Sequence, residues 1–257
     1  INALESELDA AASYCRAESL GIEVTAFAFP HTLSDELDAS ISRHAAAVAG
    51  IVPLSVHGPF LDLYPASRDK EVVALARRRH EQGLRASTVL GATLYVAHLS
   101  FLPFIRNRGY PDGFAAATAE FWAPLADEAA SHGITVVLEN LWEPGPEMQR
   151  AALDHARHPA LKASFDNGHA LVFSNVPAAT WIEVIGADLA HCHLHDNDGQ
   201  EDQHGAVGTG REEWDALFAA VRRHASECQI VLESDDLARN RASVAAARAY
   251  FLSNGAR

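Results

Sequence analysis

The chain is poor in cysteine and has no long apolar run. Its three cysteines, Cys15, Cys192 and Cys228, are far apart in the sequence and form neither a zinc-type pair nor a disulfide framework. That usage is typical of a reducing compartment, so we expect a cytoplasmic location. No apolar run approaches the roughly 18 residues of a membrane-spanning helix, and we expect no membrane partner.

Positive charge is also scarce. The 20 Lys and Arg residues are outnumbered by 34 Asp and Glu, which gives a formal net charge of -14. Phosphate backbones are bound through a surplus of Lys and Arg, so DNA is not the expected partner. Lys70 and Lys162 are the only lysines, which leaves few candidates for Schiff-base catalysis. The sequence also lacks a nucleophile elbow, a phosphate loop and a dinucleotide-binding fingerprint.

Helical patterns alternate with short apolar runs along the whole chain. The helical patterns cover roughly 2–20, 33–50, 68–90, 112–132, 147–157, 177–186, 211–225 and 239–253, and the strand-like runs are 22–27, 52–57, 93–98, 134–139, 161–166, 189–193 and 229–233. This alternation predicts a parallel sheet and, at 257 residues, a single (β/α)8 TIM barrel domain over residues 1–257.

Two points of the fold stay open at this stage. A doubly wound open sheet, or two smaller domains, would also suit the pattern and the length. Only seven strands are counted, and the chain opens directly in a helical pattern. We therefore expect the first strand of the barrel to be missing or to lie just before residue 1.

Histidine is abundant, with 14 residues. We expect half of them to be scattered over the surface, namely His31, His44, His80, His132, His155, His158 and His224. The placement of others is more informative, because six of the seven predicted strands end in a side chain that can bind a metal. These are His57, His98, Glu139, Asp166, His193 and Glu233.

The strand ends meet at one place. All strands of a barrel run the same way, so their carboxyl ends converge on one mouth, where barrel enzymes have their active sites. One acid or imidazole there is often only a hydrogen-bonded or ion-paired structural group. Six such groups carry a large burial cost unless a ligand compensates it, which favours a metal site.

Two local motifs add further ligand types. In Asp166-Asn167-Gly168-His169 a second ligand follows the first on the turn leaving the strand, and Asp202-Gln203-His204 offers a carboxylate and an imidazole in the next loop. The glycines of Gly208-Thr209-Gly210 allow a close backbone approach, although as a phosphate cradle the motif is weak.

Four more residues are candidates for substrate contact. His195 shares strand parity with His193, so it is a partner of the ligands, a substrate contact or a solvated loop histidine. Phe60 and Trp142 lie just beyond strand ends, where they would wall a sugar or simply pack. Arg106, after His98, is the best phosphate-binding candidate and is otherwise a solvated loop residue.

Together these motifs resemble the xylose isomerase-like barrel superfamily, which includes endonuclease IV and the sugar isomerases and epimerases. The resemblance covers about residues 22–233 and is carried by His57-Gly58-Pro59-Phe60, Glu139-Asn140, Asp166-x-x-His169, His193-x-x-Asp196 and Asp202-x-His204. For the ketose epimerase branch it implies one divalent ion held by Glu139, Asp166, His193 and Glu233. For the endonuclease IV branch it implies three zinc ions held by His57, His98, Glu139, Asp166, His169, His193, Asp202, His204 and Glu233.

The favoured hypothesis is a divalent-metal-dependent sugar or sugar-phosphate isomerase or epimerase, with Zn, Mn or Co as the metal and one to three ions per chain. In it Glu139 and Glu233 remove and return a proton next to a carbonyl, and His169 contacts the substrate. An endonuclease IV-like multi-zinc phosphoester hydrolase is the alternative, which the acidic charge disfavours. A non-catalytic metal-binding barrel is a second alternative, and homo-oligomer formation stays open.

Overall fold

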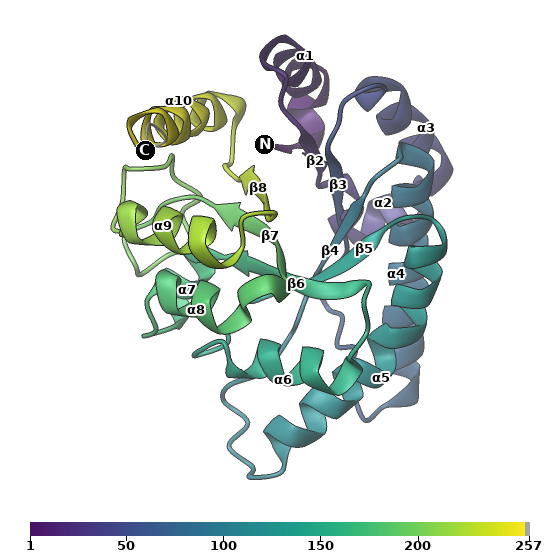
Figure 1. The fold of residues 1–257 in the computed structure, drawn as a ribbon. Helices are drawn as coiled ribbons and strands as arrows, with labels where there is room; N and C mark the ends of the chain where they lie inside the picture. Colours follow the sequence, from purple (N-terminus) through teal and green to yellow (C-terminus); the bar gives the residue numbers. More distant parts are fainter. Residues whose placement is uncertain (255–257) are drawn as a thin grey trace.

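The computed structural model of the protein describes residues 1–254 as a nearly closed barrel of parallel strands inside a ring of helices (Figure 1). Each strand pairs with the next one along the chain, in the order β1 to β8. The strands are β1 (Asn2–Ala3), β2 (Ile22–Val24), β3 (Leu54–His57), β4 (Leu94–His98), β5 (Thr135–Glu139), β6 (Leu161–Asp166), β7 (Leu189–Leu194) and β8 (Gln229–Leu232). The predicted (β/α)8 TIM barrel is confirmed.

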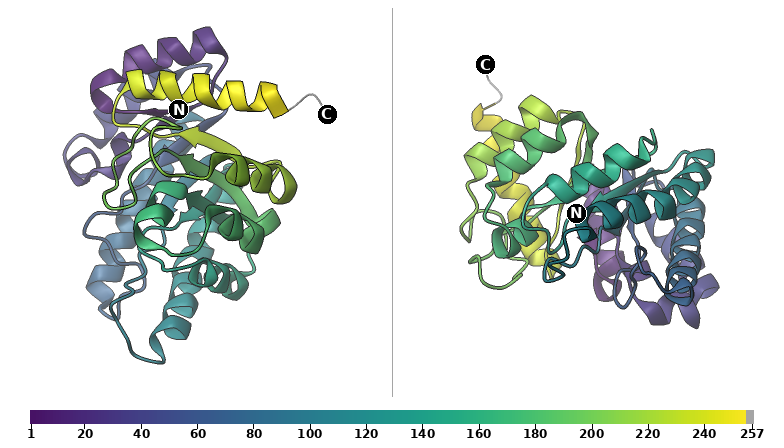
Figure 2. Two further views of the ribbon diagram at one scale, coloured as in Figure 1. Left: turned by 90° about the vertical axis from the view of Figure 1, so that its left-hand side faces the viewer. Right: turned by 90° about the horizontal axis from the view of Figure 1, so that it is seen from below.

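The helices connect successive strands on the outside of the barrel (Figures 1 and 2). Local signals mark their ends: in α4 the Asp69 side chain accepts a hydrogen bond from the Glu71 N–H, and Gly91 ends the helix with a left-handed φ of 76°. The helices are α1 (Leu8–Glu18), α2 (Pro30–Ser34), α3 (Leu37–Val48), α4 (Lys70–Leu90), α5 (Tyr110–Ser131), α6 (Glu147–Ala156), α7 (Asn167–Phe173), α8 (Ala178–Ile185), α9 (Trp214–His224) and α10 (Leu237–Asn254).

Three sequence-based expectations were wrong in detail. The first strand is present as β1, a two-residue strand inside the segment predicted as helix, where it is too short to show a strand pattern. The predicted strand 22–27 ends at Val24 and passes into a 3-10 turn (Ala26–Ala28). His169, expected on the turn that leaves the strand, lies instead in the first turn of helix α7.

Side chains close the seam between the two ends of the sheet. Asn2 of β1 is buried; its amide donates to the Ser234 carbonyl oxygen (3.2 Å) and accepts from the Ser234 N–H (3.1 Å) and the Asn240 amide (2.7 Å). Outside this seam α10 lies beside α1 (Figure 2), where Arg248 donates to the Glu18 backbone oxygen (3.0 Å). The two ends of the chain therefore complete the ring.

Replacing Asn2 with Ala is expected to lower the free energy of unfolding by about 2–4 kcal/mol, since buried polar groups of Ser234 and Asn240 lose their partner. Urea denaturation in the presence of a chelator measures it. Asn175→Ala, at an exposed position, is the control and should change stability little. A change in Asn2→Ala no larger than in this control would show that the seam does not depend on Asn2.

The register of the strands directs a set of polar side chains into the barrel. Cross-strand partners include Glu23 with Ser55, His98 with Glu139, and Asp166 with His193. Barrel interiors are usually filled by branched apolar residues. Polar layers in the middle and at the mouth therefore need another explanation than packing.

Two of the histidines expected on the surface are buried instead. His44 is 1% exposed and its Nδ1 lies 2.8 Å from the Ser40 carbonyl oxygen; His80 is 2% exposed and its Nδ1 lies 3.0 Å from the Tyr95 hydroxyl. Both lie on helices that pack against the barrel, where a hydrogen bond compensates burial of the ring.

In the part of the chain that the structure describes, no single helix is long and apolar enough to be a candidate membrane span, whereas one pair of helices, Asn167–Phe173 and Ala178–Asp188, bent by 118°, meets those criteria when taken together.

Candidate metal centre

The nine predicted metal-binding side chains form one connected cluster at the mouth of the barrel. Each has a nitrogen or carboxylate oxygen within 3.8 Å of another member, and Asp202 and His204 reach the cluster from the loop after β7. The structure brings together the side chains that the sequence placed on separate strands. Their role as ligands stays a prediction.

Glu139 is the centre of this cluster and faces two groups at once. Its Oε2 lies 3.5 Å from Nε2 of both His57 and His98, and its Oε1 lies 3.2 Å from Nδ1 of His193. His57, His98 and Glu139 form one set of atoms compact enough to hold a metal ion, and Glu139, Asp166 and His193 form a second. A carboxylate shared in this way is suited to bridge two ions.

The hydrogen bonds of the histidines direct lone pairs into the cluster. His57 Nδ1 lies 2.8 Å from the Gly58 carbonyl oxygen and His169 Nδ1 lies 2.8 Å from the Asn140 carbonyl oxygen, contacts that only an N–H can make. An imidazole that binds a metal is neutral and has one N–H, so Nε2 of each ring would be the ligand atom.

Buried polar atoms in the centre have no hydrogen-bond partner within the described chain. These include Glu139 Oε2 and His193 Nδ1, which point into the cluster from β5 and β7. A buried polar atom of this kind is costly unless something binds it. The donor set, imidazole nitrogens and carboxylate oxygens without thiolates, suits Zn, Mn or Co. These residues therefore fit a divalent metal.

The loop after β7 brings further side chains to the cluster, beside one that was not predicted as a ligand. Asp202 Oδ2 lies between His169 Nε2 (3.4 Å) and His204 Nε2 (3.1 Å). The more compact set is His195, His204 and Glu233, in which the rings of His195 and His204 stack with centroids 4.2 Å apart. His195 is fully buried with Nε2 3.3 Å from Asp166, so the interpretation as a solvated loop histidine was wrong.

The charges of the cluster hold its groups far from their usual ionisation. Burial would raise the pKa of Glu139, but His193 and His98 hold it well below the usual value. Burial would lower the pKa of His169, but Asp166, Asp202 and Glu139 hold it well above. Burial dominates at His98 and lowers its pKa to about 3. Nearby positive charge thus stabilises the ionised carboxylates, and a divalent ion would supply such charge in place of the histidine protons.

Several residues named above only as parts of sequence motifs support the cluster. The Asn140 amide bonds both backbone groups of Asp166 (2.9 Å each), and the Asn167 amide bonds both backbone groups of His195. Gly168 leaves room for His195, since a Cβ there would lie 1.9 Å from the ring. The sequence signal for this role is that Asn140 and Asn167 each directly follow a predicted strand.

Glu23 and His191 were not predicted as site residues from the sequence. Both are fully buried in the layer beneath the mouth, and together with His193 they form a further set compact enough for a metal. Burial would raise the pKa of Glu23, but the neighbouring His193 and His191 hold it well below the usual value. One Glu in a three-residue strand carries no sequence pattern that reveals such a position.

The predicted substrate-contact residues outside the cluster separate into two sets. The Phe60 ring stacks on His98 with centroids 4.2 Å apart, and Phe60 and Trp142 line one pocket of about 360 Å³. Arg106 is exposed in the loop between β4 and α5 and is not among the residues that line this pocket. The pocket lies next to the cluster through Phe60.

Comparison with known proteins identifies a family with this barrel fold. Residues 14–253 match the family described as xylose isomerase-like TIM barrel. The chain belongs to this family. It is similar to the TTHB071 protein of Thermus thermophilus, in a structure obtained by soaking with ZnCl2, with 31% identity, a TM-score of 0.82, and coverage of 100% of this chain and 98% of the other.

Solved structures of lower sequence identity share the fold. A D-tagatose 3-epimerase-like protein is 22% identical with a TM-score of 0.75 (90% and 88% of the two chains), and the E. coli 3-keto-D-glucoside 4-epimerase is 18% identical with a TM-score of 0.73 (96% and 97%). An uncharacterised protein of Methanocaldococcus jannaschii is 28% identical over 169 residues, 62% of this chain but only 56% of that protein's length.

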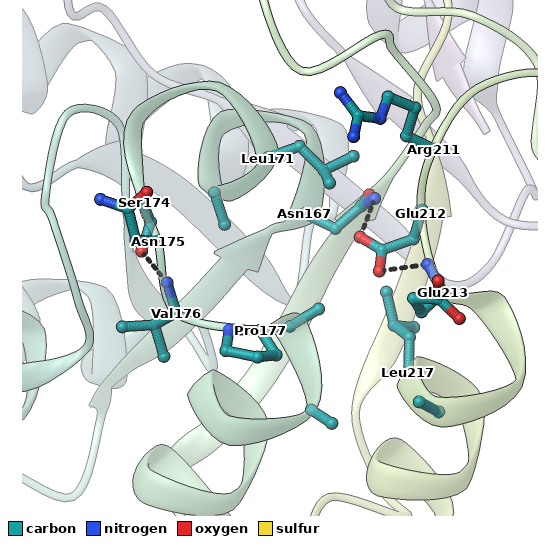
Figure 3. Close-up of a pocket in the computed structure, with 14 residues that line it drawn as sticks. Asn167, Leu171, Ser174, Asn175, Val176, Pro177, Arg211, Glu212, Glu213 and Leu217 are labelled. Carbon is teal, nitrogen blue, oxygen red and sulfur yellow. Dashed lines mark hydrogen bonds between the residues drawn. The ribbon is translucent and has the colours of Figure 1, made fainter.

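A second pocket, of about 240 Å³, lies outside this family barrel between α7, α8 and α9 (Figure 3). None of the predicted site residues lines it. Asn167 connects it with the centre, because its amide donates to Glu212 Oε2 and to the His195 carbonyl oxygen (2.9 Å each). Asn167 thus contributes to the metal centre by supporting the backbone of His195.

Glu143, a buried acid outside the cluster, gives the protein a further pH dependence. It is 1% exposed and accepts hydrogen bonds from the Phe101 N–H (3.2 Å) and the Leu141 N–H (2.5 Å), and burial raises its pKa to about 7. Between its unfolded value, about 4.5, and the folded value, the folded state binds more protons, so stability falls as pH rises.

We expect the free energy of unfolding to fall between about pH 5.5 and pH 8 by about 2 kcal/mol more in the unchanged protein than in Glu143→Gln, which cannot titrate. Urea denaturation across this range, with a chelator present, measures the difference. The exposed variant Glu227→Gln should follow the unchanged protein. Parallel curves for Glu143→Gln and the unchanged protein would contradict the prediction.

Proposed function

We propose that the protein is a divalent-metal-dependent isomerase or epimerase that acts on a neutral sugar bearing a carbonyl group. The main support for the proposal is that the carboxylates of Glu139 and Glu233 both lie next to one nitrogen atom of His193. Glu139 Oε1, from β5, and Glu233 Oε2, from the end of β8, each lie 3.2 Å from His193 Nδ1. Two acids that converge from different strands suit proton removal and return at one carbon.

Glu139, Asp166, His193 and Glu233 would hold the ion on which the sugar binds. A bound divalent ion polarises a carbonyl and so acidifies the hydrogen on the neighbouring carbon. The unpartnered Glu139 Oε2 and His193 Nδ1 support this assignment, as does the ZnCl2-soaked relative.

Glu139 and Glu233 then perform the proton transfer. One carboxylate takes the proton from the carbon next to the carbonyl, and the other delivers a proton to the opposite face or to the adjacent carbon. His169 and His195 are buried beside Asp166 and would orient the hydroxyl groups through hydrogen bonds. Near-exclusion of solvent around these groups protects the carbanion-like intermediate from side reactions.

The pocket beside the cluster favours a neutral sugar over a sugar phosphate. It is lined by Phe60, Leu61, Asp62, Leu63, Tyr64, Ser100, Leu102, Leu141 and Trp142, with no Lys or Arg among them. Phosphate groups are usually bound by such cations or by helix N-termini. The sugar epimerases among the structures with this fold agree with a sugar substrate.

One observation favours a second candidate, a multi-zinc phosphoester hydrolase. Three sets of side chains at the mouth are each compact enough for an ion: His57 with His98 and Glu139; Glu139 with Asp166 and His193; and His195 with His204 and Glu233. Several adjacent ions can clamp the attacking and leaving oxygens of a phosphodiester. The net charge of -14 remains unfavourable for DNA.

Deuterium incorporation tests the choice directly. The protein is incubated in D2O with Zn²⁺, Mn²⁺ or Co²⁺ and a panel of neutral ketoses and keto-sugars, and carbon-bound deuterium is measured by NMR. We expect exchange at one carbon next to the carbonyl, together with an isomeric product. Nicking of an oligonucleotide with an abasic site, without any exchange, would instead support the hydrolase.

A further inference from the structure

Glu23 is a fully buried carboxylate directly behind the predicted metal centre. It lies on β2 with 0% exposure, and Oε1 accepts a hydrogen bond from Nε2 of His193 at 2.6 Å. Oε2 accepts from the Ser55 hydroxyl at 2.8 Å, and Ser55 in turn accepts from the Gln229 amide at 3.2 Å. A chain of hydrogen bonds thus holds the carboxylate in place from below.

His193 shows what this carboxylate does. With Nε2 on Glu23, the other nitrogen, Nδ1, faces Glu139 and Glu233 and has no hydrogen-bond partner. A metal ligand is a neutral imidazole with one N–H, and the short contact with Glu23 would keep that N–H on Nε2. A metal ion would then take the place of a proton on Nδ1, the nitrogen that faces the cluster.

We propose that Glu23 is a positioning residue that fixes the tautomer and ring orientation of His193, so that this histidine binds a metal ion through Nδ1. The inference rests on the metal binding proposed above. A carboxylate behind a ligand histidine also makes the ring a stronger donor, and loss of such a partner typically weakens metal binding about 10- to 100-fold.

Burial energetics argue against a purely structural role. A buried carboxylate contributes little net stability compared with an apolar residue of the same size, and a barrel interior offers such a residue an ordinary place. His191 Nε2 also lies 3.1 Å from Glu23 Oε2, so the acid has a second imidazole beside it in the same layer. His191 is itself held by Ser164, at 2.8 Å from Nδ1.

Zinc affinity of the full chain tests the role. Chelator-treated protein is titrated with Zn²⁺ against a chromophoric competitor, and bound zinc is counted by elemental analysis. Glu23→Gln, which keeps the shape, should bind zinc about 10- to 100-fold more weakly at one site with an unchanged number of sites at saturation. Ser55→Ala, one contact further away, should show a smaller loss, and Glu128→Gln, at an exposed position, none.

The possible outcomes separate the two proposals. Unchanged zinc affinity in Glu23→Gln, or a lower melting temperature of the chelated protein with unchanged affinity, would overturn the positioning role. Loss of one whole site, with the other affinities intact, would overturn it as well, since Glu23, His191 and His193 would then be ligands of their own ion. Failure of the unchanged protein to bind any divalent ion would instead sink the proposed function.

A different observation concerns two thiols on the outside of the same strands. Cys192 Sγ and Cys228 Sγ lie 3.3 Å apart, and both are free. Cys192 alternates with His191 and His193 on β7, so it points away from the barrel interior; it is fully buried. Cys228 precedes β8 and is half-buried, so it is the thiol that a small oxidant can reach.

We infer that Cys192 and Cys228 form a site of oxidative modification that closes to a disulfide. Hydrogen peroxide oxidises the Cys228 thiol to a sulfenic acid and is itself reduced to water. The Cys192 sulfur then attacks the Cys228 sulfur, and a second water leaves with the Cys192 proton. The sulfur atoms need to approach from 3.3 Å to about 2.0 Å.

Thiol counting in denaturant tests this site. The reduced chain should show three thiols and the peroxide-treated chain one, Cys15, with the loss of two hydrogens in the intact mass and a peptide joining Cys192 to Cys228. Cys15→Ser should fall from two thiols to none, whereas Cys228→Ser should keep both of its thiols. Three remaining thiols after treatment, or bonds only between chains, would overturn the inference.

Discussion

Replacing Glu139 with Gln is expected to abolish activity, with a loss of about a thousandfold or more, and to lower metal content at the same time. The carboxylate offers Oε2 to His57 and His98 and Oε1 to His193, so each oxygen serves a different group. An amide has only one acceptor oxygen, and its NH2 would face one group with hydrogens where a lone pair is needed.

Elemental analysis of protein purified without chelator, together with the exchange assay in D2O, checks both parts of this expectation. Glu128→Gln, an exposed residue of α5, is the matched control and should keep full metal content and activity. If Glu139→Gln retains the metal content and the turnover of the unchanged protein, the metal centre described here does not carry the reaction.

Glu233→Gln is expected to lower turnover by about 10²- to 10⁴-fold while the fold stays intact. Glu233 lies just after β8 at 9% exposure, so exchanging an oxygen for an NH2 there leaves the barrel core unchanged. Its Oε2 shares His193 Nδ1 with Glu139. When one of two acids is lost, the other can still remove the proton from its own side of the substrate.

We therefore expect Glu233→Gln to separate hydrogen exchange from epimerisation. In D2O, Glu233→Gln should exchange the hydrogen of one epimer at a measurable rate and form little of the other, whereas Glu139→Gln should do neither. Thermal unfolding of both chelated variants establishes that they are folded. Retention of full epimerisation by Glu233→Gln would remove this residue from the mechanism, and Glu139 would then need another partner.

The two variants also separate metal binding from proton transfer. Glu139 stands in two of the compact sets at the mouth, and Glu233 stands in the set with His195 and His204. Glu233 is also assigned, with Glu139, Asp166 and His193, to the ion that would bind the sugar. We therefore expect Glu139→Gln to weaken the two ions at the centre, and Glu233→Gln to weaken the sugar-binding ion and the ion of the third set. Measured zinc content per chain then tells whether the third set takes part in the chemistry or is dispensable for it.

Periodicity along the chain was enough to predict the barrel and most of the mouth. Each of the seven predicted ranges holds a strand, although the strand in 22–27 ends at Val24, because most of these buried parallel strands are apolar runs that local sequence reveals. Once a parallel barrel was assumed, His57, His98, Glu139, Asp166, His193 and Glu233 had to converge, since all strands share one direction. Their contacts in the structure follow from that topology.

Only the tertiary structure revealed which side chains close the barrel and support the residues at its mouth. β1 has two residues, and Asn2 closes the seam through bonds to Ser234 and Asn240, more than 230 positions away. Glu23 resembles an ordinary surface acid until barrel closure turns it inward beneath His193. His195 follows β7 in the sequence like a loop residue, but it is buried because Gly168 of α7 packs against its ring. Pairing of this kind depends on where distant segments meet in space, and local sequence carries no record of that.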